Sequence, residues 1–175
     1  MSNKTDASAK AAATRILMKM YKGYQEDPSP YFNCGLIDNN PFHWRLIING
    51  VEGTILSGGL FPAELTFKDD FPLSPPKMVF KCPMWHPNID SKTGDVCISI
   101  LHNPGVDELN PQESASERWN PTHTVESIVL SVLSMLQSPN PESPLNIPAN
   151  REFMNDPEKY KQNVRRHVRR SIEYL

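Results

Sequence analysis

The chain has 175 residues, of which 38% are hydrophobic and 22% are charged, and its formal net charge is −2. This is the size and composition of one soluble globular domain, and it excludes an intrinsically disordered chain. The small net charge gives no indication of binding to nucleic acid or to an anionic membrane surface.

The sequence contains three cysteines, Cys34, Cys82 and Cys97. An odd and sparse set argues against a disulfide framework, so we expect reduced thiols and a cytoplasmic or nuclear protein. The first residues contain no apolar segment typical of a signal peptide, and no run has the length of a membrane span. We therefore expect no direct membrane insertion.

The first expected element is a helix that follows a flexible N-terminal extension at residues 1–13. Apolar residues recur at helical spacing from about Thr14, and the Asp27-Pro28 pair ends the pattern.

Four strands are expected next, at residues 31–37, 42–48, 59–67 and 77–82. No helical pattern separates them, which predicts an antiparallel meander. In the third strand the alternation predicts that one face is buried, with Phe61, Ala63, Leu65 and Phe67. Pro62 in this strand indicates an edge or bulged position, because proline has no N–H for the sheet.

The second half begins with an irregular stretch at residues 82–121, and such a length inside a compact domain is usually functional. A central helix then follows, capped by Thr124. Its wide apolar stripe comprises Val125, Ile128, Val129, Val132, Leu133 and Leu136.

Two C-terminal helices complete the expected α+β domain, which spans residues 14–175. Asp156 and Pro157 are a typical cap and first residue for the last helix. Its buried side is expected to carry Tyr160, Val164, Val168 and Ile172.

The irregular stretch holds the candidates for chemistry. Cys97, between Val96 and Ile98, could by itself be an inert buried thiol. However, a reacting thioester needs a thiol, a hydrogen-bond donor for the oxyanion and a rigid frame. Asn88 could supply that donor through its side-chain amide, in a segment that prolines hold in place.

Two other sites could use the same residues. A zinc site could combine two thiols and two imidazoles, from Cys82, His86, Cys97 and His102, although the spacings are loose. A cysteine hydrolase could use Cys97 as nucleophile and His102 as base, but the sequence indicates no residue that would orient the imidazole.

The segment at residues 86–97, with His86-Pro87-Asn88 followed by Gly94 and Cys97, resembles the active-site signature of ubiquitin-conjugating enzymes. Three further segments resemble that family in the expected order: the proline-rich turn at 71–77, the Trp-x-Pro element at 119–121 and the loop at 139–146. Four motifs in series are far more specific than any one of them.

The resemblance implies the ubiquitin-conjugating core fold and an acyl transfer reaction. Cys97 would accept ubiquitin as a thioester from an activating enzyme and pass it to a substrate lysine, with a RING-type ligase and without a metal or cofactor of its own. The alternative is a non-catalytic variant that binds ubiquitin or a ligase; inactive relatives lack the cysteine, which is present here.

The resemblance also implies roles for the residues around Cys97. Asn88 would stabilise the oxyanion or order the active-site loop. Ser99 and Ser143 stand where many members have aspartates that gate the site, and serine cannot act as a base at neutral pH. His102 or acidic residues of the neighbouring loop would then assist the incoming lysine.

Two docking surfaces are implied as well. The ligase-docking loops would comprise Pro72 and Leu73 together with Asn120, Pro121 and Thr122. The contact with the activating enzyme would involve Arg15 and Lys19 on the first helix.

Residues 104–118 form an acidic insert before the Trp-x-Pro element and resemble the acidic-loop class. Members of that class build ubiquitin chains, and several serve degradation of endoplasmic-reticulum proteins, which would require recruitment to that membrane by a partner. The chain departs from the family in one respect: Cys97 follows Asn88 by nine positions (97 − 88 = 9), one more than usual. We expect the extra residue to bulge outward within residues 90–93.

Overall fold

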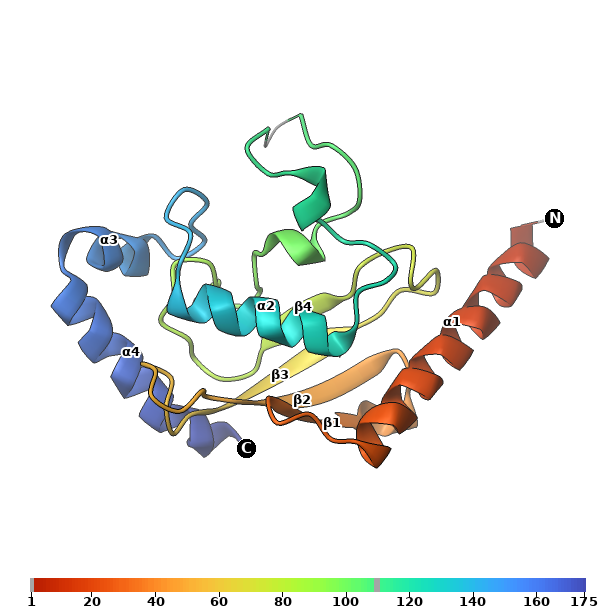
Figure 1. Ribbon diagram of the computed structural model, residues 1–175, viewed down its shortest axis with the longest axis horizontal. Coiled ribbons are helices and arrows are strands. Elements are labelled where there is room, and N and C mark those ends of the chain that lie inside the picture. The colour runs from red at the N-terminus through yellow and green to blue at the C-terminus, as the bar shows by residue number, and fades with distance from the viewer. Residues whose placement is uncertain (1, 109–110) are drawn as a thin grey trace.

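The computed structural model describes residues 2–108 and 111–175. Within them, one antiparallel sheet with the strand order β1-β2-β3-β4 is combined with four α-helices (Figure 1). The strands are β1 (Phe32–Leu36), β2 (His43–Asn49), β3 (Leu60–Thr66) and β4 (Lys77–Phe80). The helices are α1 (Ser2–Glu26), α2 (Val125–Gln137), α3 (Ile147–Asn155) and α4 (Pro157–Ser171). The expected α+β class and the meander are confirmed.

Helix α2 crosses one face of the sheet, while α1 and α4 lie at opposite ends of the molecule (Figure 1). Thr124 caps α2 and Asp156 caps α4, as the sequence predicted. The predicted apolar stripe of α2 is buried, as is the predicted face of β3. In the described parts of the chain, no helix combines the length and the hydropathy needed to cross a membrane.

Helix α1 is longer than expected, because it begins at Ser2 and not near Thr14. Residues 2–13, expected as a flexible extension, continue the helix, and Met1 lies outside the described residues. This segment is rich in alanine, which has the highest helix propensity, and contains neither glycine nor proline. The apolar pattern marks only where the helix reaches the core, at Ala13 and Leu17.

Pro62 occupies an interior strand and not the expected edge, since β3 pairs with both β2 and β4. The strand tolerates it because β4 ends at Phe80, opposite Ala63. The carbonyl of Pro62 accepts a hydrogen bond from the backbone of Lys81 at 2.8 Å, and its nitrogen faces the same side, just beyond the last residue of β4. The missing N–H therefore removes at most one hydrogen bond, the reciprocal bond to Lys81, at the point where β4 has already ended.

Helix α4 buries Tyr160, Val164 and Val168 as predicted, but Ile172 is 52% exposed. A four-residue repeat advances by roughly 40° around an α-helix at each step, so the last member leaves the buried face. The buried position at this end belongs to Ser171, whose hydroxyl accepts a hydrogen bond from the backbone of Leu60 at 3.1 Å.

Candidate active site

A short hairpin places Asn88 and Cys97 next to each other. The backbone N–H of Cys97 donates to the carbonyl of Asn88 at 3.0 Å, and the N–H of Asp90 donates to the carbonyl of Asp95 at 2.9 Å. The turn between them is closed by the Asp90 carboxylate, which accepts hydrogen bonds from the backbone of Lys92 and Thr93. Residues 90–93, where the extra residue was expected, form this closed turn, and Asn88 and Cys97 remain hydrogen-bonded neighbours.

Gly94 attaches this hairpin to the sheet. Its carbonyl accepts a hydrogen bond from the backbone of Phe80 at 2.9 Å. Its φ is +76°, and a Cβ atom there would lie 2.1 Å from the carbonyl oxygen of Phe80. Only glycine fits this approach without a shift of the backbone.

His86 is a buried, neutral imidazole that supports the same segment. Its Nε2 lies 2.9 Å from the carbonyl of Met135 and donates to it, while its Nδ1 accepts from the backbone of Asn88 at 3.0 Å. Burial lowers the pKa of His86 to about 4, although the bond to Met135 opposes the shift. Both ring nitrogens are thus occupied by protein groups.

This arrangement is incompatible with the zinc alternative. Besides the two occupied nitrogens of His86, the thiol of Cys82 is buried against the sulfur of Met84 at 3.7 Å. Over residues 2–108 and 111–175, no group of three or more potential metal ligands comes together. The four residues of that alternative do not form a common site.

The side chain of Asn88 holds the loop that carries Ser143. Its amide nitrogen donates to the carbonyls of Asn140 at 2.8 Å and Ser143 at 3.1 Å. Its amide oxygen accepts from the backbone of Asn140 at 2.8 Å. Both N–H bonds of the amide are therefore occupied, so the geometry corresponds to loop ordering and leaves no free donor for an oxyanion.

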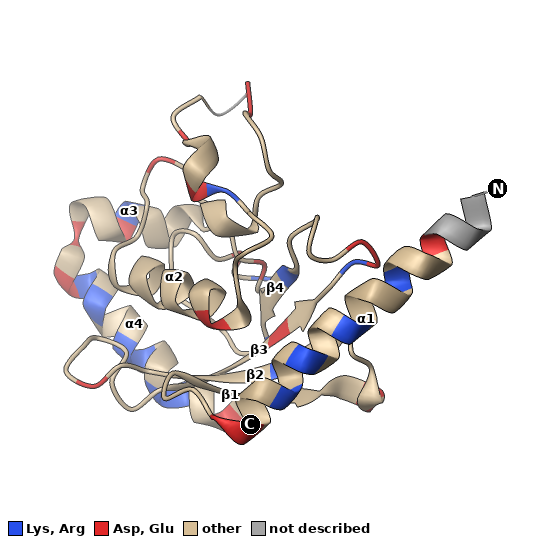
Figure 2. Ribbon diagram, turned by 45° about the vertical axis from the view of Figure 1, so that its right-hand side comes forward, with Lys and Arg blue, Asp and Glu red and all other residues tan. Residues whose placement is uncertain are grey.

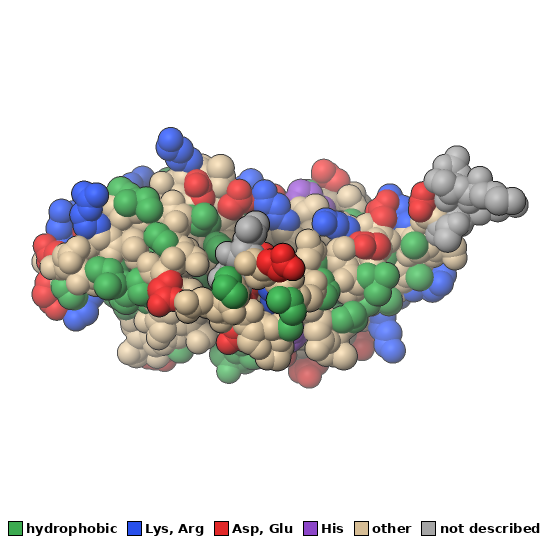
Figure 3. All heavy atoms as spheres, turned by 90° about the horizontal axis from the view of Figure 1, so that it is seen from above, with side chains coloured by type: hydrophobic (Ala, Val, Ile, Leu, Met, Phe, Trp, Pro, Cys, Tyr) green, Lys and Arg blue, Asp and Glu red, His purple; other side chains and the backbone are tan. Residues whose placement is uncertain are grey.

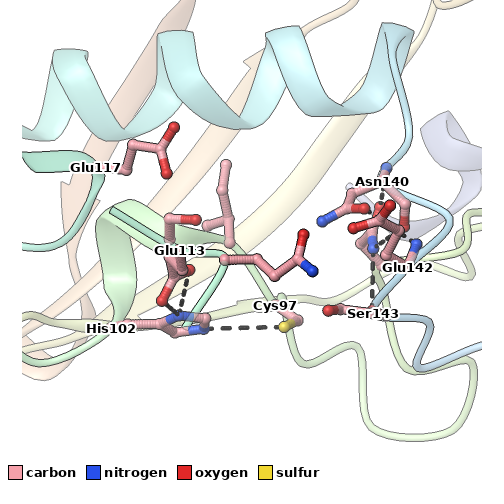
Figure 4. Close-up of a pocket in the computed structure, with 11 residues that line it drawn as sticks. Cys97, His102, Glu113, Glu117, Asn140, Glu142 and Ser143 are labelled. Carbon is pink, nitrogen blue, oxygen red and sulfur yellow. Dashed lines mark hydrogen bonds and ion pairs between the residues drawn. The ribbon is translucent and has the colours of Figure 1, made fainter. Parts of the chain in front are cut away.

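Cys97 lines a mostly polar cavity of about 410 Å³. Figure 4 shows the thiol between His102 on one side and Ser143 on the other. Burial raises the pKa of the Cys97 thiol, and the nearby charge of Glu113 raises it further. The group is therefore a thiol and not a thiolate at neutral pH.

A row of side chains leads from the thiol into the insert (Figure 4). The Cys97 Sγ lies 3.8 Å from Nε2 of His102, and Nδ1 of His102 lies 2.9 and 3.0 Å from the two carboxylate oxygens of Glu113. Glu113 also forms an ion pair with Arg118 at 2.6 Å. The sequence predicted Cys97 and His102 here, but it did not single out Glu113 or Arg118.

Arg118 anchors the insert from the inside. Its guanidinium donates to the carbonyl of Asn103 at 2.9 Å and to the carboxylate of Asp107 at 3.1 Å, in addition to its ion pair with Glu113. Ser114 and Glu117 form a reciprocal capping box in the same segment. Residues 109–110 of the insert lie outside the described residues.

The two predicted ligase-docking loops lie side by side. The indole N–H of Trp119 donates to the carbonyl of Pro72 at 2.8 Å. Leu73 is 66% exposed next to it, while Asn120 closes its own turn by accepting from the backbone and hydroxyl of Thr122. Pro121 lies inside that turn.

Arg15 and Lys19 are exposed one turn apart on α1. They belong to a row of basic residues along this helix (Figure 2). Helix α1 lies at one end of the molecule and contributes none of its described residues to the lining of the cavity (Figure 1).

Comparison with known proteins identifies the same family that the sequence motifs resemble. Residues 16–168 match the family model described as "Ubiquitin-conjugating enzyme". The chain is 49% identical to ubiquitin-conjugating enzyme E2 15 of Schizosaccharomyces pombe, over 94% of this chain and 98% of the relative. It is 47% identical to ubiquitin-conjugating enzyme E2 14 of Arabidopsis thaliana, over 93% and 97%, and 44% identical to ubiquitin-conjugating enzyme E2 G2 of Homo sapiens, over 91% and 96%. The chain therefore belongs to the ubiquitin-conjugating enzyme family and is a transferase that acts through a cysteine thioester.

Proposed function

We propose that Cys97 is the cysteine that carries ubiquitin, received from an activating enzyme and passed to a substrate lysine. One observation carries this assignment. Of the three cysteines, all of which the structure describes, only Cys97 lies in a polar cavity with an imidazole beside its sulfur. Cys82 is buried beside Met84, and Cys34 lies on β1, where its side-chain partner is Gln25.

His102 is the proton acceptor in this proposal. Ser99 cannot take that role, because a serine is not a base at neutral pH and its hydroxyl is bound to the Glu113 carboxylate. The Nε2 atom of His102 faces the sulfur at 3.8 Å, so it also lies close to a carbonyl carbon bonded to that sulfur.

The transfer step then balances as follows. The lone pair of an uncharged lysine amine forms the new C–N bond at the thioester carbonyl, and the C–S bond breaks with its electron pair going to Cys97. The nitrogen gives up a proton to Nε2 of His102, and that proton passes on to the thiolate. The products are an amide, a free thiol and an unchanged imidazole.

A RING-type ligase would bind at Pro72 and Leu73 and at the loop formed by residues 120–122. The exposed Leu73 side chain and the contact between the two loops support a composite apolar docking surface. Arg15 and Lys19 would bind an acidic surface of the activating enzyme.

We further infer that the enzyme builds ubiquitin chains for protein degradation, in the cytoplasm or nucleus or at the endoplasmic-reticulum surface through a partner. The insert supports this, because its Val106 is 83% exposed, while its Gln112, Glu113 and Glu117 line the cavity that holds Cys97. Acidic and hydrophobic side chains lie next to one another in the middle of the face that carries the insert (Figure 3). Such a surface could guide a second ubiquitin toward the thioester.

A charging assay tests the assignment of Cys97. The protein is mixed with activating enzyme, ATP and ubiquitin, and the products are separated on a gel with and without thiol. We expect a thiol-sensitive band that is one ubiquitin heavier and that Cys97→Ala abolishes, while Cys34→Ala and Cys82→Ala retain it. A band that persists in Cys97→Ala would overturn the assignment, and no band in any variant would favour a non-catalytic ubiquitin- or ligase-binding role.

A further inference from the structure

We propose that Glu113 is a positioning residue that fixes the tautomer of His102 and thereby leaves Nε2 free to accept the proton of the attacking amine. The inference rests on the proposed role of His102 and concerns how the insert prepares it.

The chemistry of the two partners determines the direction of the hydrogen bond. An ionised carboxylate can only accept hydrogen bonds, and a neutral imidazole carries a single N–H. Because Nδ1 lies 2.9 and 3.0 Å from the two oxygens of Glu113, the ring proton belongs on Nδ1. Nε2, which faces Cys97, then has a free lone pair, as a proton acceptor requires.

Glu113 is held in its ionised form by its surroundings. Its side chain is only 7% exposed, and burial alone would raise the pKa of its carboxyl group. Hydrogen bonds from Ser99, His102 and Arg118 outweigh that effect and hold the pKa below its usual range. The ion pair with Arg118, itself 8% exposed, also fixes the carboxylate in place, through the same Oε2 atom that lies 3.0 Å from Nδ1 of His102.

These contacts give the insert a role in the reaction itself, because its Glu113 contacts the His102 imidazole. Arg118 holds Glu113. Glu113 holds the imidazole, and the imidazole faces the sulfur (Figure 4). Without the carboxylate, nothing among the described contacts keeps the proton on Nδ1. A proton on Nε2 would point a donor, and not an acceptor, at the reacting atoms.

The test is the discharge of the preformed Cys97–ubiquitin thioester to free lysine, measured in a single turnover. Free lysine removes any contribution of the insert to binding an acceptor ubiquitin. We expect His102→Ala to slow discharge roughly 100-fold and Glu113→Gln to slow it roughly tenfold or more. The double variant should be as slow as His102→Ala alone, because Glu113 acts only through the imidazole.

Two variants separate this effect from a change of charge and from loosening of the insert. Glu52→Gln makes the same change of charge on an exposed loop elsewhere and should leave discharge unchanged. Asp107→Asn removes another carboxylate partner of Arg118, whereas the carboxylate that faces Nδ1 of His102 is that of Glu113, so Asp107→Asn should slow discharge much less than Glu113→Gln. If Asp107→Asn slows discharge as much as Glu113→Gln, the role of Glu113 is structural and the proposal fails.

The tautomer can be read directly from the ¹⁵N shifts of the His102 ring at a pH at which it is neutral. We expect the proton on Nδ1 in the unaltered protein and on Nε2 in Glu113→Gln, where the new amide N–H can donate to Nδ1. A proton on Nε2 in the unaltered protein would overturn the proposal without any variant.

The experiments also distinguish this inference from the proposed function. Normal discharge by His102→Ala would remove the imidazole from the reaction, and the inference with it. Slow discharge by His102→Ala together with normal discharge by Glu113→Gln would leave the imidazole in place and overturn only the role of Glu113. Loss of charging in Cys97→Ala is independent of both.

Discussion

On one side of Cys97, Asn88 holds the loop at residues 140–143 through hydrogen bonds between uncharged groups. On the other side, Glu113 holds His102 and Arg118 through an ionised carboxylate. The two sides differ in what they can do for a reaction. An uncharged amide fixes geometry and exchanges no protons, whereas a carboxylate and an imidazole control where a proton lies.

The largest expected effect comes from putting a charge on the uncharged side. In Asn88→Asp, a carboxylate that can no longer donate would face the carbonyls of Asn140 and Ser143 at a position that is 1% exposed. We expect a loss of about 3–5 kcal/mol in the free energy of unfolding, as for a buried unpaired charge, measured by urea denaturation.

Asn88→Ala is the matched control for that variant. It removes the same hydrogen bonds without adding a charge, and should cost about 1–3 kcal/mol. Equal stability of the two variants would show that this side of the cavity tolerates a charge, and the contrast between the two sides would then be lost.

The second effect is acid sensitivity that originates on the same side, at His86. The unfolded chain takes up a proton near the ordinary pKa of 6.5, whereas the folded protein holds the pKa of His86 at about 4. Stability is therefore unaffected above pH 6.5 and falls as the pH decreases toward 4, by about 3 kcal/mol in total.

Urea denaturation between pH 7 and pH 5 measures this slope before most carboxylates titrate. His86→Gln keeps a donor for Met135 and an acceptor for Asn88, and it should flatten the slope in that range. An unchanged slope in His86→Gln would assign the acid sensitivity to other groups.

A third prediction concerns the attachment of the hairpin to the sheet. Gly94 and Gly53 have nearly the same φ, +76° and +78°, but a Cβ at Gly53 would meet nothing within 4 Å. Gly94→Ala should therefore cost about 2 kcal/mol more than Gly53→Ala, which carries only the conformational strain. If both variants lose the same free energy of unfolding in thermal or urea denaturation, the hairpin can move away from Phe80 without a measurable cost.

The smallest expected effect is on the rate at which Cys97 is alkylated, and it arises on the charged side of the site. Burial and the charge of Glu113 both raise the pKa of Cys97, so its alkylation by iodoacetamide should still accelerate with pH through pH 9. Removing the charge in Glu113→Gln lowers the pKa, so alkylation at neutral pH should become a few-fold faster, with Glu52→Gln unchanged. The same substitution is expected to slow transfer to lysine. Opposite effects of this one variant on the rate of alkylation and on the rate of transfer would show that Glu113 influences thiol reactivity and proton transfer separately.

The sequence predicted the uncharged side of the site better than the charged side, for a physical reason. Asn88 and Cys97 are the two ends of one hairpin, so their proximity follows from local turn chemistry. Glu113 meets His102 only because an irregular loop folds back onto it, and no periodicity in the sequence records such a contact. The role of Arg118 as an anchor of the insert could not be predicted, for the same reason.

The errors in the fold have a common origin. Hydrophobic patterns report contact with the core and not the extent of an element, so α1 was expected to begin too late. A four-residue repeat overestimated the buried face of α4 at Ile172. The position of Pro62 depended on where its neighbour β4 ends, which the strand's own sequence does not contain.

Trp119 constrains the construction of chimeras between this enzyme and its relatives. Its indole binds the carbonyl of Pro72, and its backbone N–H binds the carbonyl of His102 at 3.1 Å. A chimera that imports the proposed docking loop from a relative would therefore also replace a support of the imidazole. If the proposed roles hold, ligase preference cannot be exchanged independently of the chemistry, because Trp119 contacts both the proposed docking loop and the segment that carries His102.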